Sequence, residues 1–342
     1  MTRPALGLVP KALECPSTSP DAQILLAEGL RKHYGSRLAL KGLSFSLRAG
    51  RVLGFLGPNG AGKTTAIRIL TTILEPTSGR FLVDGIGSEH PERIRRRIGV
   101  LPESLGFTKH ITGLECLIYF GRLYGRTAKD AKAKAGELLE EVGLEQRTKS
   151  LIGSYSRGMR QRLGIARALV NDPVIVFLDE PTLGLDPRGQ QELLVLVRRI
   201  ARGRNAGVVL CSHHLSDIEA VCDDVVILSS GEVVATGSVA EVVARVRQGI
   251  AQGHVLRIQV PPTSVGVGRH LLEGLPNVTG VTLVGEATGL LRVELAGENE
   301  DPRDRNRLLE ALIRADIPIF SFGPEGGRLQ DAFLHLTGDS IE

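Results

Sequence analysis

Residues 57–65, GPNGAGKTT, place glycines, a lysine and threonines at the spacing G-x-x-x-x-G-K-[ST]. The glycines allow a tight turn in which several backbone N–H groups point into one concavity and bind phosphate oxygens. The lysine is positioned to reach the β- and γ-phosphates of a nucleotide, and the first threonine hydroxyl to ligate Mg²⁺. The stretch therefore predicts a nucleoside triphosphate site. Its members are Gly57, Pro58, Asn59, Gly60, Ala61, Gly62, Lys63, Thr64 and Thr65.

A second stretch, VIVFLDEPT (174–182), supplies carboxylates. An apolar run that ends in an acid predicts a buried strand, and ligands of open α/β sheets bind at the carboxyl ends of such strands. Paired with the loop at 57–65, Asp179 is predicted to hold Mg²⁺. Glu180 is predicted to act as general base for a water that attacks the γ-phosphate.

A histidine follows the next predicted strand, VVLCS (208–212). Beside a phosphate site, His213 can hydrogen-bond the γ-phosphate and orient the attacking water. Considered without its context, His213 or the adjacent His214 would be interpreted as a structural or surface residue. Because it follows Glu180 and Asp186 in the chain, His213 is predicted to be catalytic.

The elements around these residues must form a sheet that brings them together. Strands are expected at 24–30, 38–47, 51–57, 80–85, 174–179 and 207–212, and helices at 63–74 and 188–202. Apolar residues at helical spacing between 106 and 150 indicate a helical insert. This alternation of strands and helices predicts an α/β fold with a parallel sheet at its core.

The two ends of the chain differ from this central part. Residues 1–22 are rich in proline and serine without periodicity, which is typical of a disordered tail. Residues 250–342 predict the order β-α-β-β-α-β of a ferredoxin-like sandwich, followed by a last helix in LQDAFLHLTG (329–338).

Composition excludes several classes of protein. The 342 residues are 42% hydrophobic and 23% charged, which is typical of a soluble globular protein. No apolar run approaches the roughly 20 residues needed to cross a bilayer, and no signal segment opens the chain. The four cysteines form no CxxC pair, which argues against zinc and disulfides. The basic run RIRRR (93–97) lacks the interleaved aromatic residues of a nucleic-acid surface, so a solvated helix face is predicted there.

Taken together, the motifs of residues 24–240 resemble the nucleotide-binding subunits of ATP-binding cassette (ABC) transporters. In that family an aromatic residue before the first strands stacks on adenine, and Tyr34 in KHYG stands there. The loop after IGVLP carries a residue that touches Mg²⁺, here Glu103. A loop that ends in an aspartate follows the Asp-Glu strand, and here that residue is Asp186 in LGLD.

The family's signature, L-S-G-G-Q, corresponds to YSRGM at 155–159. Ser156 retains its hydroxyl and Gly158 its accessible backbone N–H, and the helix that follows points its N-terminus at phosphate. In the family this signature closes on the ATP that the phosphate loop of a second subunit holds. The resemblance therefore implies a dimer, of two copies or with a paralogous ATPase, with two ATP molecules at its interface.

The resemblance also implies the architecture. It predicts a cassette at 23–240 with a RecA-like parallel-sheet core, an antiparallel β-subdomain and a helical subdomain at about 104–165, followed by the C-terminal unit. We expect that unit to stabilise the dimer or to regulate it; the alternative is that it senses a ligand. The resemblance implies ATP and Mg²⁺ as cofactors and, as partner, a membrane permease that holds the chain at the cytoplasmic face of the cell membrane.

Two positions depart from the family pattern. Glu103 stands where glutamine is usual and adds negative charge near the phosphates, although a carboxylate can still ligate Mg²⁺. Arg157 replaces the first glycine of the signature, and it either tightens ATP binding or faces solvent. We predict that Glu103→Gln retains ATP binding.

The combination of LPE, GMRQR and DAFLHLTG most resembles the ATPase subunits of type-2 exporters. Two alternatives belong to other classes. Soluble ABC ATPases that act on ribosomes or DNA usually carry two cassettes or long inserts, which this chain lacks. A phosphate-loop kinase or GTPase would have no use for Ser156, Gly158 or His213. The sequence does not define the transported substrate, because the permease selects it.

Overall fold

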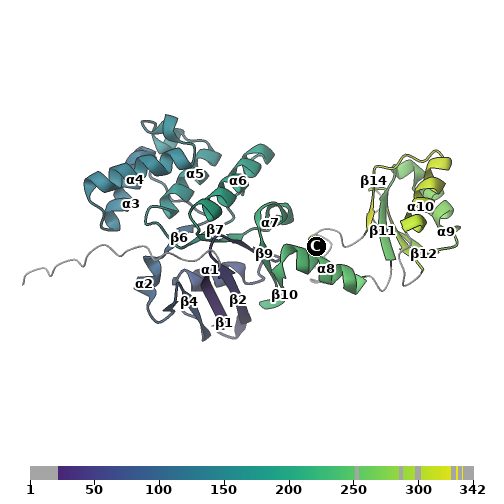
Figure 1. Ribbon diagram of the computed structural model, residues 1–342, viewed down its shortest axis with the longest axis horizontal. Coiled ribbons are helices and arrows are strands. Elements are labelled where there is room, and N and C mark those ends of the chain that lie inside the picture. The colour runs from purple at the N-terminus through teal and green to yellow at the C-terminus, as the bar shows by residue number, and fades with distance from the viewer. Residues whose placement is uncertain are drawn as a thin grey trace, which may run out of the picture.

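The computed structural model describes residues 22–250, 254–284, 288–296 and 302–324, together with Leu329 and Phe333. The predicted N-terminal tail lies outside this range except for Ala22, and the predicted last helix lies outside it except for Leu329 and Phe333. Figure 1 shows the arrangement of the elements along the chain.

The centre of the fold is a six-stranded sheet in the order β10-β9-β3-β8-β7-β6. Five strands are parallel, and β10 pairs antiparallel with β9 at one edge. Their bounds are β3 Val52–Leu56, β6 Ile98–Leu101, β7 Ile175–Asp179, β8 Gly207–Cys211, β9 Asp224–Ser229 and β10 Glu232–Ser238. The predicted parallel core is therefore confirmed.

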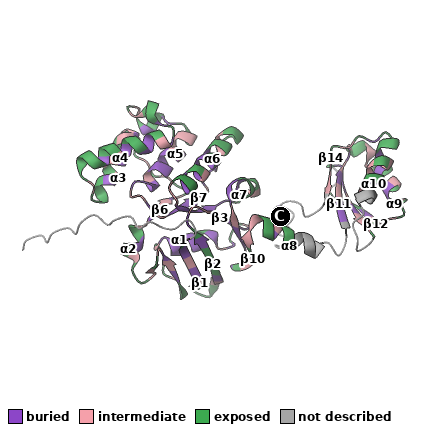
Figure 2. Cartoon of the chain, in the orientation of Figure 1, coloured by how far each residue is buried: buried purple, intermediate pink, exposed green. Residues whose placement is uncertain are grey.

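Both faces of this sheet are covered, as Figure 2 shows by the buried residues along the central strands. Side chains of a strand alternate between faces. In β7, Val176 and Leu178 join one apolar cluster, whereas Ile175 and Phe177 join the other. This double burial explains why the central strands consist of continuous apolar runs rather than alternating polar and apolar residues.

One face is covered by α1 (Lys63–Leu70) and a second sheet in the order β2-β1-β4-β5. The strands are β1 Gln23–Tyr34, β2 Arg37–Arg48, β4 Ser78–Val83 and β5 Ile86–Gly87, and their pairing is antiparallel. The short helix α2 (Pro91–Arg95) follows β5. The predicted basic run begins on this helix and continues past its end: Arg93, Arg95 and Arg96 are exposed, and Arg97 pairs with Asp84.

The opposite face is covered by α5 (Arg157–Ala168), α6 (Pro187–Gly203) and α7 (Leu215–Val221). The predicted helical insert consists of α3 (Gly113–Leu123) and α4 (Ala128–Glu141), which pack on each other and on α5. Short 3-10 turns, η1 (Glu145–Arg147) and η2 (Ile152–Ser154), connect α4 to α5.

The helix after the phosphate loop is shorter than the sequence pattern predicts. It ends at Leu70, four residues before Leu74. The Thr71 hydroxyl donates to the carbonyl of Ile67 at 2.7 Å, and Thr72 adopts a positive φ of 61°. A left-handed residue cannot continue an α-helix, so the apolar spacing from 71 to 74 belongs to the turn that leads into β4.

The C-terminal part has the predicted ferredoxin-like order. After α8 (Val239–Ile250) come β11 His254–Gln259, η3 Pro262–Ser264, α9 Val265–Glu273, β12 Val278–Leu283, β13 Leu290–Leu295, α10 Pro302–Arg314 and β14 Ser321–Pro324. The strands form an antiparallel sheet in the order β12-β13-β11-β14. Each half of the unit is therefore a split β-α-β motif. It has its own apolar core, which includes Ile258, Leu272, Leu291 and Leu312.

Two residues near the C-terminus belong instead to the core of the cassette. Leu329 and Phe333, both helical, are buried in the apolar cluster that also includes Ile218 and Val242. The backbone N–H of Leu329 also donates to the carboxylate of Glu219 on α7. The chain thus returns to the cassette after the C-terminal unit (Figure 1).

Three cysteines within the described residues, Cys116, Cys211 and Cys222, are free and buried. This agrees with the predicted structural role of the thiols. Cys15 lies outside the described residues. Within the described part of the chain, no helix combines the length and the apolar character needed to cross a membrane.

Candidate active site

The predicted phosphate loop connects β3 to α1. Its glycines are required by geometry: Gly60 and Gly62 have φ of +81° and +105°, and a Cβ on Gly57 would lie 2.3 Å from the carbonyl oxygen of Leu228. Any larger residue at Gly57 would collide with β9. The close approach of these backbones holds the loop against the sheet, with α1 beginning at its end.

Lys63 bends back over this loop. Its side chain is buried, and its Nζ donates to the carbonyl oxygens of Gly57 at 2.5 Å and Pro58 at 3.2 Å. These backbone acceptors keep the ammonium at the loop, where a nucleotide's β- and γ-phosphates would lie. Thr64, the next residue, is exposed and lines the same pocket.

Four loops meet at one edge of the sheet because β3, β6, β7 and β8 are parallel. The phosphate loop follows β3, and Glu103 follows β6. Asp179 ends β7, and His213 follows β8. The predicted convergence of side chains at the carboxyl ends of the strands is therefore present in the structure.

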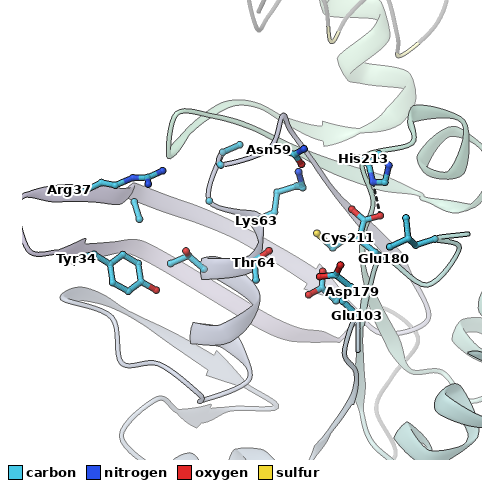
Figure 3. A pocket seen from close by; sticks show the side chains of 16 residues that line it. Tyr34, Arg37, Asn59, Lys63, Thr64, Glu103, Asp179, Glu180, Cys211 and His213 are labelled. Carbon is cyan, nitrogen blue, oxygen red and sulfur yellow. Dashed lines mark hydrogen bonds and ion pairs between the residues drawn. The ribbon is translucent and has the colours of Figure 1, made fainter. Parts of the chain in front are cut away.

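These loops enclose a pocket of about 450 Å³, shown in Figure 3, a size suited to a nucleotide. It is lined by Tyr34, Arg37, Ala39, Asn59, Gly60, Ala61, Gly62, Lys63, Thr64, Thr65, Glu103, Asp179, Glu180, Leu183, Cys211 and His213. Gly57 and Pro58 form the base of the loop behind it and bind Lys63.

Glu180 and His213 contact each other at the edge of this pocket. His213 Nδ1 lies 2.9 Å from Glu180 Oε2, drawn as a dashed line in Figure 3. The Glu180 side chain is 14% exposed and that of His213 42% exposed. Glu180 also adopts a positive φ of 49°, which is rare for a residue other than glycine. Such strain persists only where surrounding contacts impose it, and it is concentrated at functional sites.

Three carboxylates line the pocket, those of Glu103, Asp179 and Glu180. The pKa of Asp179 is raised above its ordinary value by burial, and further by the charges of Glu103 and Glu180. Burial and the charge of Asp179 likewise raise the pKa of the neighbouring Cys211 thiol. Carboxylate and hydroxyl oxygens in the lining fit Mg²⁺, which binds through one or two carboxylates together with substrate phosphates. Thr64, Asp179 and Glu103 are the residues that would hold it.

Tyr34 and Arg37 flank the other end of the pocket. They pair across the two-residue turn between β1 and β2, and both line the cavity. Tyr34 is 45% exposed, which leaves its ring accessible to a base. Arg37 was not among the predicted site residues. Its guanidinium would lie 3.8 Å from a Cβ built on Gly60, so it adds positive charge beside the phosphate loop.

The remaining predicted residues lie elsewhere. Ser156, Gly158 and Asp186 line a second hollow of about 390 Å³, and none of them lines the nucleotide pocket. Ser156 caps α5 by accepting the Met159 N–H at 3.2 Å, which leaves its own hydroxyl hydrogen free to be donated. Asp186 is exposed at the start of α6.

The altered signature residues have distinct surroundings. Tyr155 is buried in the cassette core and its hydroxyl donates to the Arg147 carbonyl at 2.9 Å, so it replaces an apolar leucine without exposing polar surface. Arg157 is exposed at the second hollow and lies against Gly184, where a Cβ would be 2.4 Å from its Cζ. It therefore adds a positive charge beside Ser156.

Comparison with known proteins identifies the family. The model of the ABC transporter family matches residues 40–183. The linearmycin resistance ATP-binding protein LnrL of Bacillus subtilis is 32% identical over 93% of this chain and 99% of its own length. The chain belongs to the ATP-binding proteins of ABC transporters. It is accordingly an ATPase, and its nucleotide is ATP.

Other relatives of this ABC protein agree. The daunorubicin resistance protein DrrA3 of Streptomyces coeruleorubidus is 35% identical over 92% of the chain and 96% of its own length. The Nod factor export ATP-binding protein I of Ralstonia nicotianae is 38% identical over 92% and 94%. These relatives support the exporter branch expected from the sequence rather than the soluble ATPases.

Solved structures match the cassette part. An ATP-binding subunit of an ABC transporter superposes with a TM-score of 0.58 and 30% identity, over 66% of this chain and 94% of that chain. A dimeric bacterial ABC transporter cassette superposes with a TM-score of 0.57 and 25% identity, over 63% and 98%. The predicted cassette fold is therefore confirmed.

Proposed function

We propose that this protein powers an exporter by closing as a dimer around two ATP molecules and reopening after hydrolysis. In each closed site, Lys63 of one chain and Ser156 of the other grip the same γ-phosphate. The energy for the cycle comes from the different affinities of ATP and ADP for the closed state. The partner chain is a second copy or a paralogous ATPase.

The separation of the two hollows on one chain carries this proposal. Ser156 and Gly158 present a hydroxyl donor and a helix N-terminus in a hollow that contains no phosphate loop. The nucleotide pocket, in turn, contains a phosphate loop but no signature residue. Both half-sites are completed if two chains pack with the hollow of one over the pocket of the other.

For hydrolysis, we assign Glu180 as the base that takes a proton from the attacking water and His213 as the residue that orients this water. Their 2.9 Å contact places both polar groups on one side of the pocket, and Lys63 lies at its phosphate loop. Water adds to the γ-phosphorus as the bond to the β-phosphate oxygen breaks, which gives ADP and phosphate. Mg²⁺ held by Thr64, Asp179 and Glu103 would supply charge neutralisation at the phosphates.

The helical insert is the proposed contact with the permease. Along α3, Tyr119 and Leu123 are four residues apart and so lie on one face, and they are 59% and 63% exposed. Tyr124 at the end of the helix is 45% exposed. An exposed apolar face suits docking to another protein. This contact would hold the chain at the cytoplasmic face of the membrane.

The proposal is tested with Glu180→Gln in the full-length chain. Size-exclusion chromatography with ATP and Mg²⁺ is expected to show a stable dimer, and ATP hydrolysis is expected to fall to near background. Wild-type protein with ADP serves as the control and is expected to remain monomeric. A Glu180→Gln chain that hydrolyses ATP at the wild-type rate would refute the assignment of the base.

A further inference from the structure

A buried carboxylate, that of Asp217, contacts the loops after β7 and β8. Asp217, in the first turn of α7, is only 3% exposed and does not line the nucleotide pocket. Among the described residues, Lys63 is the other charged side chain that is buried to a comparable degree. An ionised carboxylate is costly to bury unless its oxygens accept hydrogen bonds, so the partners of Asp217 indicate why it is there.

Those partners come from the two loops that carry the catalytic residues. Asp217 Oδ2 accepts from the Thr182 hydroxyl at 2.5 Å and from the Ser212 hydroxyl at 3.3 Å. Thr182 is two residues after Glu180, and Ser212 directly precedes His213. Both hydroxyl residues are fully buried. One carboxylate oxygen thus joins the loop after β7 to the loop after β8.

The same connection extends into the backbone. Ser212 Oγ accepts the N–H of His214 at 3.0 Å, while the N–H of Asp217 donates to the His214 carbonyl at 3.1 Å. These contacts fix the backbone on both sides of His213. On the other loop, the Thr182 carbonyl accepts the N–H of Leu185, which closes the turn after Glu180.

The helix that carries Asp217 rests directly on the central sheet. At Gly54 in β3, a Cβ would lie 2.9 Å from both Ile218 Cδ1 and Cys222 Sγ, so the absence of a side chain permits close packing of this region on the strand. Ile218 is fully buried. Because β3 leads into the phosphate loop, packing on β3 holds α7 in a fixed position relative to that loop. From α7, Asp217 reaches the loop after β7 and the loop after β8.

We propose that Asp217 is a positioning residue for ATP hydrolysis: through Thr182 and Ser212 it sets the relative placement of Glu180 and His213. The 2.9 Å contact between Glu180 and His213 joins residues from separate strands, and the strained backbone of Glu180 requires restraint from its surroundings. Asp217 supplies that restraint through hydroxyl groups that do not line the nucleotide pocket. This inference rests on the roles proposed above for Glu180 and His213.

The central test is Thr182→Val, which keeps the side-chain shape and removes the hydroxyl that Asp217 binds. We expect kcat for ATP to fall about tenfold to a hundredfold, since small misplacements of catalytic groups have effects of this size. The KM for ATP and the affinity for a fluorescent ATP analogue are expected to stay within twofold, because neither Thr182 nor Asp217 lines the pocket. Asp217→Ala is likewise expected to lower kcat while leaving the KM for ATP within twofold of the wild-type value.

The matched control is Thr71→Val. Thr71 is also buried and its hydroxyl also makes one short hydrogen bond, to the Ile67 carbonyl, but it lies at the end of α1 outside this network. Thr71→Val is expected to lower the melting temperature without changing kcat. If Thr182→Val and Thr71→Val reduce kcat equally, or if Thr182→Val leaves kcat unchanged, the proposal is overturned.

Two further variants separate positioning from general destabilisation. Asp217→Asn keeps an acceptor oxygen for Thr182 and is expected to recover part of the kcat lost in Asp217→Ala. Combining Thr182→Val with Asp217→Ala is expected to be no worse than the more damaging single change, because both remove one interaction. Full additivity would contradict the proposed link.

Glu180→Gln, assayed in the same series, distinguishes failure of the proposed role of Asp217 from failure of the proposed function. If Glu180→Gln is inactive and Thr182→Val is normal, the inference about Asp217 fails while the proposed function stands. If Glu180→Gln hydrolyses ATP normally, the proposed function itself fails.

Discussion

His213 Nδ1 lies 2.9 Å from Glu180 Oε2, although the two residues come from different strands and are 33 positions apart in the chain. The contact exists because β7 and β8 are adjacent and parallel, which places the loops after them side by side. A carboxylate and a histidine so placed can act on one water molecule at the edge of the pocket.

His213→Ala tests the histidine's part in this pair. Hydrolysis is expected to fall about a hundredfold or more, as is typical when a group that assists proton transfer is lost. ATP binding, measured with a fluorescent analogue, is expected to persist because the phosphate loop is unchanged. His214→Ala is the control, since His214 does not line the pocket. Equal losses in both variants would contradict the assignment of His213.

Glu103→Gln tests the unusual carboxylate. The change removes one of the two charges that raise the pKa of Asp179, the other being Glu180, and it keeps a side-chain oxygen at position 103. We expect ATP binding to be retained and nucleotide-free protein to be more stable at neutral pH. Equilibrium binding and thermal melting measure the two effects. Loss of ATP binding would show that the placement of this loop is wrong.

The raised pKa of Asp179 predicts a pH dependence of stability. Burial and the charges of Glu103 and Glu180 hold the proton on the folded chain at pH values where the unfolded chain has lost it. Stability therefore falls as pH rises from the ordinary aspartate pKa of about 3.9 through the raised value. Without nucleotide or divalent cations, the melting temperature of Asp179→Asn should exceed that of the wild type by an amount that grows as pH rises.

Asp172 provides a control of opposite sign. Burial acts to raise its pKa, but hydrogen bonds and charge from Lys134 and Arg126 prevail and lower it. That contribution to stability is present above the ordinary aspartate pKa and is lost as pH falls. Asp172→Asn should therefore lose melting temperature relative to wild type mainly at neutral pH. Identical pH profiles for the Asp172 and Asp179 variants would contradict both assignments.

Phe333→Ala tests the return of the chain to the cassette. Phe333 is buried in the cassette cluster, and truncating a buried phenylalanine typically costs about 3–5 kcal/mol. Phe320→Ala is the matched control because Phe320 is 65% exposed. We expect Phe333→Ala, but not Phe320→Ala, to lower the free energy of unfolding of the cassette, measured by chemical denaturation. An equal, small effect of both changes would show that Phe333 does not contribute to this core.

Much of the cassette could be predicted from the sequence because its signals are local. The phosphate loop, the apolar run before Asp179 and the capped start of α5 at Ser156 each carry their structure in a few adjacent residues. The C-terminal order was also predictable, since its strands and helices alternate with clear periodicity. Apolar spacing alone predicted the end of α1 wrongly: the spacing continues to residue 74, but the backbone has already turned at Thr72.

What the sequence did not reveal depends on contacts between distant segments. Arg37 lines the pocket because the two-residue turn between β1 and β2 places it opposite Tyr34. That pairing is seen in the structure and has no motif in the sequence. Asp217 lies 35 residues from Thr182 and has no motif of its own. Leu329 packs into the cassette after an intervening folded unit, a relationship that periodicity cannot indicate.

The most direct test of the central claim is a structure of the Glu180→Gln chain with ATP and Mg²⁺. We expect two chains facing each other, with the Ser156 hydroxyl of one within about 3 Å of a γ-phosphate oxygen of the ATP that Lys63 of the other binds. If ATP occupies the pocket and Ser156 contacts no phosphate in any pairing of chains, the proposed dimeric ATP site is wrong.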